Sequence, residues 1–411
     1  MTPVSGPLNG VKILDLTHVW AGPLAVRFLA DLGAEVVRVE APDGRGPLVF
    51  PSTPLGGWIS GPSSDEPWND NALFVKLMRN RSSVSLDLKT EAGRRVFLQL
   101  ASCADVLVEN FSARVMPGFG LDYEALKPIN PNLLYVSMPG FGQSGPLCNR
   151  VAFGPTVEAF SGFTQMMGYS ADEPRNTAMA LMDPVSGTNA VAAILTGLRQ
   201  REVTGEGAMI EMSLHEGGVG YNGPWLVDTQ LDEIPAPSCL GNRHPQIAPH
   251  GVYACAGEDQ WIALACPDDG QWRSLCEFVD VGDAEWSVAK RMDHHDEIDD
   301  AISAWVLQYS KEEAAARLQL AGISAGPVNS APDMIADDQV ADRGYFARYE
   351  RYDVPMPGNP LRIPGLDPSE WRRSPRLGEH NREVLKDWLD YSDGQIDALE
   401  NDGVLADRPP A

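Results

Sequence analysis

The stretch VKILDLTHVWAGPLAVRFLADLGAEVVRVE, residues 11–40, holds two short apolar runs on either side of a helical pattern. Residues 11–16 and 35–40 have the length and composition of buried strands. Residues 23–32 have helical apolar spacing, which stops at Gly33. The stretch therefore predicts a β-α-β unit at the start of the chain.

The same alternation continues along the chain. We expect strands at 82–88, 104–111, 133–141 and 208–216, and helices at 91–103, 123–131 and 184–201. Such alternation is typical of an α/β fold with a parallel, doubly wound sheet. From about residue 226 the pattern changes to short strands and helices separated by loops, which predicts a smaller α+β domain over 226–335.

Residues 41–70 interrupt the alternation with a long loop rich in Pro, Gly and Ser. Trp58 and Trp68 in this loop, together with Trp20 and the stretch QMMGY at 165–169, favour either ordinary core packing or a pocket for a medium-sized or aromatic organic acid.

Composition excludes several classes of protein. The 411 residues carry a formal net charge of −25, which argues against binding to nucleic acid or to an anionic membrane. There is no 18-residue apolar run and no signal-peptide pattern at the start. Six cysteines without a C-x-x-C pair indicate reduced thiols, and DHHDE at 293–297 is typical of a solvated surface. We therefore expect a cytoplasmic protein without a metal site or membrane span.

The first turn of the β-α-β unit is inconsistent with a nicotinamide dinucleotide. THVWAGP, residues 17–23, has one glycine and lacks the G-x-G-x-x-G spacing, so Glu40 is interpreted as a surface acid at a strand end. The basic run around Lys76, Arg79 and Arg81 is either a solvated face or a cradle for phosphates.

The stretch ALMDPVSG, residues 180–187, presents a single carboxylate. Asp183 followed by Pro184 predicts a helix N-cap with proline at the first helical position. Small residues follow in the first turn, so a ligand could approach closely. The neighbouring sequence does not offer a His, Ser or Cys arrangement that would form a triad with Asp183, and any catalysis by Asp183 would therefore be as a carboxylate nucleophile.

Seven stretches, taken in order, resemble the family III CoA-transferases, the group that includes formyl-CoA transferase and the carnitine-related enzymes. They begin with residues 8–42 and continue with NRSSVSLDLKTEAG, ADVLVENF, NPNLLYVSMPGFGQSGP, MDPVSG, TGEGAMIEMSLHE and GNRHPQIAPHGVY. The resemblance implies a Rossmann-like large domain built from residues 1–225 and a return segment 336–411, a small inserted domain at 226–335, and a homodimer of interlocked rings.

The resemblance also implies an activity, the transfer of CoA from an acyl-CoA donor to a free organic acid, with CoA as co-substrate and without a metal. The family's nucleophilic aspartate falls on Asp183, which would form anhydride and aspartyl-CoA thioester intermediates. Contacts to CoA fall on Arg38, Arg81, Asn110, Phe111 and Arg150, and contacts to the acid fall on His18, Trp20, Ala21, Gly241 and Asn242. A tight turn is an equally good interpretation of Gly241 and Asn242.

The sequence departs from the family pattern at several positions. SARVMPGFG, after VENF, has one basic contact fewer, which Arg114 could replace. Trp20 stands where formyl-CoA transferase has glutamine, which disfavours oxalate and formate as substrates. Acyl-CoA racemases of the same fold have a histidine where this chain has Phe153. This chain therefore lacks the second base that racemisation by two bases needs. The alternatives are such an isomerase, or a CoA-binding protein without catalysis.

Overall fold

The structure is a computed structural model that describes residues 4–43, 57–59, 65–170, 172–231, 239–349 and 352–409. Its described residues form two compact units. The larger unit comprises segments 1–163, 176–230 and 342–411, and the smaller comprises 164–175 and 231–341. The borders therefore lie a few residues beyond those expected from the sequence, and residues 164–175 join the smaller unit. Most of the 41–70 loop lies outside the described residues.

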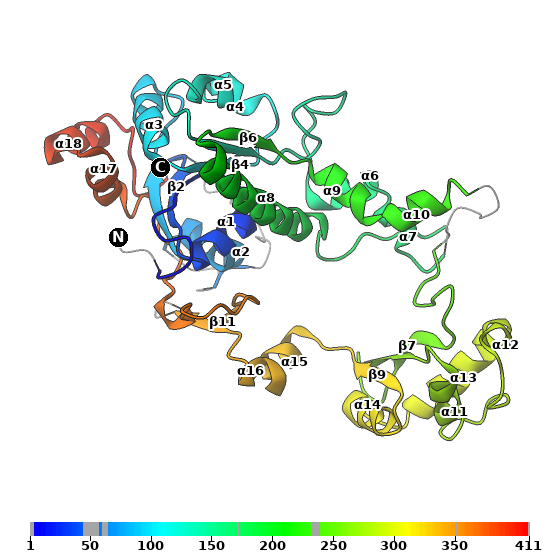
Figure 1. Ribbon diagram of the computed structural model, residues 1–411. Coiled ribbons are helices and arrows are strands. Elements are labelled where there is room, and N and C mark those ends of the chain that lie inside the picture. Colours follow the sequence, from blue (N-terminus) through cyan, green and yellow to red (C-terminus); the bar gives the residue numbers. More distant parts are fainter. Residues whose placement is uncertain are drawn as a thin grey trace. The chain divides into compact units, whose positions relative to one another are not determined.

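The larger unit is built on a six-stranded sheet in the order β3-β2-β1-β4-β5-β6. Strands β2, β4 and β6 of this sheet are labelled in Figure 1. The strands are β1 (Lys12–Asp15), β2 (Glu35–Glu40), β3 (Arg81–Ser85), β4 (Val106–Glu109), β5 (Leu134–Ser137) and β6 (Ala208–Glu211). Every neighbouring pair is parallel, so the predicted parallel sheet is confirmed. Strand order reverses between β1 and β4, and doubly wound folds bind ligands at that point.

Helices cover both faces of the sheet, because alternate strand residues are apolar on each face. One core contains Leu14, Val37, Val84, Leu107 and Tyr135 and packs against α3 (Glu91–Cys103), α5 (Tyr123–Leu126), α17 (Asn381–Leu389) and α18 (Asp393–Asn401). The other contains Ile13, Val36, Val106, Leu134 and Val136 and packs against α1 (Ala21–Asp31), α6 (Gly154–Phe160) and α8 (Met182–Thr204). The remaining helices of the larger unit are α2 (Ala72–Leu77), α4 (Val115–Phe119), α9 (Leu214–Tyr221) and α10 (Gly223–Asp228).

The predicted strand over 208–216 is wrong in its second half. The strand β6 ends at Glu211, and α9 begins at Leu214. Ser213 causes the change, because its side chain accepts a hydrogen bond from the N–H of Glu216 and caps the helix.

The smaller unit is an antiparallel sheet with helices around it. Its strands β7 (His250–Ala254), β8 (Trp261–Ala265) and β9 (Ser324–Pro327) form the sheet in that order. Its helices are α11 (Asp269–Leu275), α12 (Val288–Asp293), α13 (His295–Val306), α14 (Lys311–Leu320) and α15 (Ala331–Ala336), while α7 (Phe163–Met166) and α16 (Asp338–Asp342) lie at its borders with the larger unit. The core lies around Trp272, Ile262 and Ile298.

The chain then returns to the larger unit, where β10 (Ala347–Tyr349) pairs with β11 (Tyr352–Met356). Beyond them, the return segment lies against the edge strand β3. The N–H of Ser83 donates to His380 Nδ1 at 3.1 Å, and the N–H of His380 donates to the carbonyl of Ser83 at 3.0 Å. The N–H of Ser85 donates to the Asn381 side chain at 2.9 Å. These bonds satisfy a sheet edge that would otherwise be open to pairing with another chain.

Candidate active site

The strand order places a loop from each of β1 and β4 at the reversal point. His18 follows β1, and its N–H donates to Asn110 Oδ1 at 2.7 Å. Asn110 Nδ2 donates back to the His18 carbonyl at 2.8 Å, so the two loops are joined by a reciprocal pair. The His18 ring lies 5.2 Å from the Phe111 ring. The structure thus brings together three residues that the sequence assigned to substrate or CoA.

Asp183 is not the cap of its own helix, so that prediction is wrong. Helix α8 begins at Met182, and Leu181 is the N-cap without a side-chain hydrogen bond. Asp183 is the second helical residue and is 8% exposed. Its carboxylate accepts hydrogen bonds from the backbone N–H groups of Ala21 and Gly154. These are the first residues of α1 and α6, so the starts of three helices meet at one carboxylate.

Glycines allow this close approach. A Cβ atom at Gly154 would lie 2.2 Å from Asp183 Oδ2. A Cβ atom at Gly187, one turn further along α8, would lie 2.7 Å from the Ala21 carbonyl. The small residues of the MDPVSG block therefore let α8 pack against the start of α1.

Burial raises the pKa of Asp183 to about 6, and the nearby Glu158 carboxyl adds to the rise. The N–H groups of Ala21 and Gly154 act in the opposite direction. Among the described residues, no lysine or arginine forms an ion pair with Asp183. The carboxylate is therefore mostly ionised at neutral pH, and its charge is held by backbone dipoles alone.

Glu158 orders the segment that leads into Asp183. Its side chain is fully buried and accepts hydrogen bonds from the N–H of Thr177 at 3.0 Å and from Thr177 Oγ1 at 2.5 Å. It also accepts one from the N–H of Leu181. Sequence analysis missed both Glu158 and Gly154. The Gly154–Pro155 pair was the available signal, because proline near a helix start is common.

Two residues beside the carboxylate have strained backbones. Val19 has a φ of 65° and Ala180 has a φ of 47°. A β-branched residue is a true outlier in this region. Val19 lies two residues before Ala21, and Ala180 lies three residues before Asp183. Strain of this kind persists where surrounding contacts enforce it, and it gathers at functional sites.

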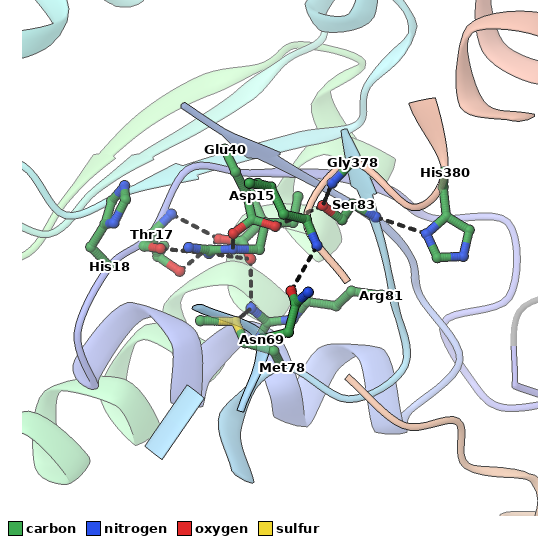
Figure 2. A network of polar contacts seen from close by, with 12 residues as sticks. Asp15, Thr17, His18, Glu40, Asn69, Met78, Arg81, Ser83, Gly378 and His380 are labelled. Atoms are coloured by element: carbon green, nitrogen blue, oxygen red, sulfur yellow. Dashed lines mark hydrogen bonds and ion pairs between the residues drawn. The ribbon is translucent and has the colours of Figure 1, made fainter. Parts of the chain in front are cut away.

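Two of the three arginines assigned to CoA, Arg38 and Arg81, are buried and paired. Figure 2 shows Arg81 with Asp15. Arg81 Nη1 lies 2.6 Å from Asp15 Oδ2, and Arg38 lies 3.5 Å from the same oxygen. Arg38 Nε also lies 3.2 Å from Glu40 Oε2. Glu40, interpreted from sequence as a surface acid, is 1% exposed, so that interpretation is wrong.

The same two arginines hold the loop before α1. Arg38 Nη1 donates to the Thr17 carbonyl at 2.6 Å, and Arg81 Nη2 donates to the Pro23 carbonyl at 2.5 Å. They therefore fix both ends of residues 17–23, which contain the strained Val19 and the N–H of Ala21 that reaches Asp183.

The other residues predicted for the site lie in different surroundings. Arg150 is exposed and Trp20 is half-buried, with Lys76 Nζ 4.6 Å from the Trp20 ring centre. Gly241 and Asn242 belong to the smaller unit, where they line a groove of about 410 Å³ with His250 and Arg243. Gly241 has a φ of 60°, as a tight turn requires.

Comparisons with known proteins identify the family of the chain. The model of the family described as CoA-transferase family III matches residues 8–381, so the chain belongs to that family. A succinate–glutarate CoA-transferase from Agrobacterium fabrum is 34% identical, over 92% of this chain and 95% of its own. An acetyl-CoA:oxalate CoA-transferase from Acetobacter aceti is 33% identical, over 93% and 96%.

A solved structure has the same fold. The crystal structure of a CAIB/BAIF family protein from Brucella suis matches with a TM-score of 0.81 and 29% identity, over 93% of this chain and 99% of that one. The protein is therefore an enzyme of the CoA-transferase class, as the sequence predicted. No helix among the described residues is long and apolar enough to cross a membrane.

Proposed function

We propose that the protein transfers CoA from an acyl-CoA to a free carboxylic acid by covalent catalysis on Asp183. The observation that carries this proposal is the setting of the carboxylate: it is buried, without a cation among the described residues, and bound by the N–H groups of Ala21 and Gly154. An ion pair would lower the nucleophilicity of the carboxylate, whereas backbone N–H groups orient it and leave its charge available.

The proposed reaction has four steps. Asp183 attacks the donor thioester carbonyl, the C–S bond breaks, and a mixed anhydride and CoA thiolate result. The thiolate then attacks the Asp183 carbonyl carbon, which releases the donor acid and leaves an aspartyl-CoA thioester. The acceptor carboxylate attacks that thioester and forms a second anhydride, and the thiolate finally attacks the acceptor's acyl carbon and frees Asp183. Protons are not exchanged, so no neighbouring base is needed.

The pKa of about 6 supports this role. At pH 7 about nine-tenths of the carboxylate is ionised, yet its basicity exceeds that of an ordinary aspartate. In the second and third steps the Asp183 carbonyl carbon is attacked, and the N–H groups of Ala21 and Gly154, which already bind this carboxyl group, would stabilise the oxygen that gains charge.

For the acid, we propose a short dicarboxylate. The relative from Agrobacterium fabrum is named for succinate and glutarate, and the relative from Acetobacter aceti for oxalate. Lys76 Nζ lies over the ring of Trp20, the residue before Ala21. We propose that this cation binds the second carboxylate of the substrate. Trp20, which stands where formyl-CoA transferase has glutamine, disfavours oxalate, so we propose an acid of four or five carbons.

We further propose that Asn110 and Phe111 contact CoA at the reversal point, with Arg150 near its phosphates, and that the enzyme is a homodimer. Arg38 and Arg81 act mainly by positioning the loop before α1, because each already has carboxylate and carbonyl partners. Sedimentation equilibrium of the purified protein tests the dimer.

The decisive experiment traps the intermediate. Protein incubated with succinyl-CoA and then hydroxylamine should carry a hydroxamate on the peptide containing Asp183, detected by mass spectrometry. Asp183→Ala should remove the adduct and lower kcat at least about 10⁴-fold, as loss of a covalent nucleophile does. Retained turnover in Asp183→Ala overturns the mechanism.

Two further readouts separate the alternatives. An isomerase would exchange the α-proton of an acyl-CoA for deuterium without any free acid. A non-catalytic protein would bind CoA and exchange no acid from a panel of succinate, glutarate, malate and benzoate.

A further inference from the structure

A second site lies away from Asp183, between the edge strand β3 and the return segment. It is a cavity of about 660 Å³. Its charged lining residues are five arginines and one glutamate, namely Arg81, Arg348, Arg372, Arg373, Arg376 and Glu379. Trp371 and His380 complete one wall. None of these residues is among those that bind or perturb Asp183. So much positive charge is unusual in a chain whose net charge is −25.

The one carboxylate in this lining is already occupied. Glu379 Oε1 and Oε2 accept hydrogen bonds from Arg373 at 2.5 and 2.9 Å. Glu379 Oε2 also accepts one from the N–H of Arg376 at 2.7 Å. Its oxygens are therefore occupied by Arg373 and the backbone. Arg81 is paired with Asp15, and Arg376 Nε lies 3.6 Å from Glu66 Oε2. The lining therefore offers no carboxylate to Arg372.

Several buried donors of the lining lack an acceptor within the described part of the chain. They are Trp371 Nε1, Arg81 Nε, and both Nε and Nη1 of Arg372. Trp371 is 8% exposed and Arg81 is 2% exposed. Indole and guanidinium nitrogens can only donate hydrogen bonds. Buried donors are nearly always satisfied in native proteins, so this cluster lacks a group that brings acceptor oxygens.

We propose that this cavity binds a small organic phosphate that carries at least two negative charges. Phosphate supplies more acceptor oxygens than one carboxylate, and arginine is the side chain best suited to it. The volume lies within the range of small-molecule sites. The phosphate could belong to CoA or to a separate metabolite, and the experiment below distinguishes these sources.

The test measures binding by isothermal titration calorimetry, with pyrophosphate, ADP and CoA as separate probes on the full-length protein. Wild-type protein should bind pyrophosphate or ADP at millimolar or lower concentration, and affinity should fall as salt rises. Arg372→Gln should weaken this binding at least tenfold. Arg376→Gln changes an exposed side chain and should weaken it at least threefold with no loss of folding.

Arg382→Gln is the matched control, because Arg382 carries the same charge on the neighbouring α17 and does not line this cavity. It should leave the dissociation constants unchanged. Absence of pyrophosphate and ADP binding to the wild type overturns the proposal, as does an Arg372→Gln affinity within twofold of wild type when circular dichroism shows a folded protein.

The source of the phosphate follows from kinetics. If CoA occupies the cavity, Arg372→Gln raises the KM for succinyl-CoA at least fivefold with little change in kcat. If a separate metabolite binds there, the KM is unchanged while pyrophosphate binding is lost. Asp183→Ala should keep the binding of pyrophosphate in either case, so failure of the transfer mechanism and failure of this site are distinguishable.

Discussion

Asp15 and Asp183 are both buried carboxylates close to the start of α1, and their surroundings are opposite. Asp15 contacts Arg81 and Arg38 and accepts a hydrogen bond from Thr17 Oγ1 at 2.6 Å. Asp183 contacts two backbone N–H groups, and the acidic Glu158 lies near it. The first arrangement neutralises a buried charge, whereas the second leaves it partly uncompensated.

The difference separates a carboxylate that holds the fold from one that can react. Ion-paired Asp15 orders the loop before α1 through Arg38 and Arg81. That loop in turn presents the N–H of Ala21 to Asp183. The paired site therefore supports the geometry of the unpaired one.

Breaking the paired site should have the largest effect on stability. We expect Arg81→Gln to lower the free energy of unfolding by about 3–5 kcal/mol, because it removes the 2.6 Å ion pair of the buried Asp15 and leaves the Arg38 guanidinium, at 3.5 Å, to balance its charge. Urea denaturation followed by circular dichroism measures this. Arg199→Gln removes an exposed ion pair on α8 and should cost less than about 1 kcal/mol. Equal effects of the two changes would contradict the distinction.

Neutralising the unpaired site should raise stability. The folded-state pKa of Asp183 is raised to about 6, so the native protein is destabilised as pH rises from about 4 to 6. Asp183→Asn removes that penalty and should gain up to about 3 kcal/mol above pH 6. Asn replaces one carboxylate oxygen with an NH₂ group, which donates and does not accept hydrogen bonds, and this reduces the gain. Thermal melts at pH 7.5 and 3.5 should show the gain only at pH 7.5, and a stability loss at pH 7.5 would refute it.

Displacing the unpaired carboxylate should impair activity without unfolding the protein. Gly154→Ala puts a methyl group 2.2 Å from Asp183 Oδ2 and should lower kcat about 10–100-fold, because small misplacements of reacting groups are costly. Gly220→Ala is a control in another helix, since a Cβ atom there meets nothing within 4 Å. Steady-state kinetics with succinyl-CoA compare the two, and equal rates would argue against the N–H contact from Gly154.

Protonating the unpaired carboxylate should have the mildest effect. The value of kcat/KM should fall below pH 6, to about one-tenth of its plateau at pH 5, because only ionised Asp183 reacts. Burial lowers the pKa of His18 to about 4, so titration of His18 does not change the pH profile of kcat/KM between pH 5 and 8. A profile that stays flat through pH 5 would show that another group carries the reaction.

Local sequence predicted the parts of the fold that depend on periodicity. The strand at Glu35–Glu40 and the helix at Glu91–Cys103 occur where the pattern placed them. Apolar spacing reports which side of an element is buried, and that suffices for regular elements. The helix α9 was missed because one serine cap outweighed an alternating pattern.

The candidate site depends on contacts that no local pattern contains. Asp183 resembled a cap because Asp-Pro is a common helix start, yet its actual partners lie on α1 and α6. Arg38 and Arg81 were interpreted as phosphate ligands because their acidic partner, Asp15, lies on another strand and is not visible in the local sequence. Only the order of strands brings these groups together.

The hydrogen bonds between β3 and the return segment have a consequence for folding during translation. His380 and Ser83, which pair across that edge, are 297 residues apart in the chain. At about 5–20 residues per second, the ribosome needs roughly 15–60 s between making the strand and making its cover. The nascent chain therefore carries an unpaired sheet edge during this interval, and the larger unit completes its sheet only after His380 and Asn381 have been made.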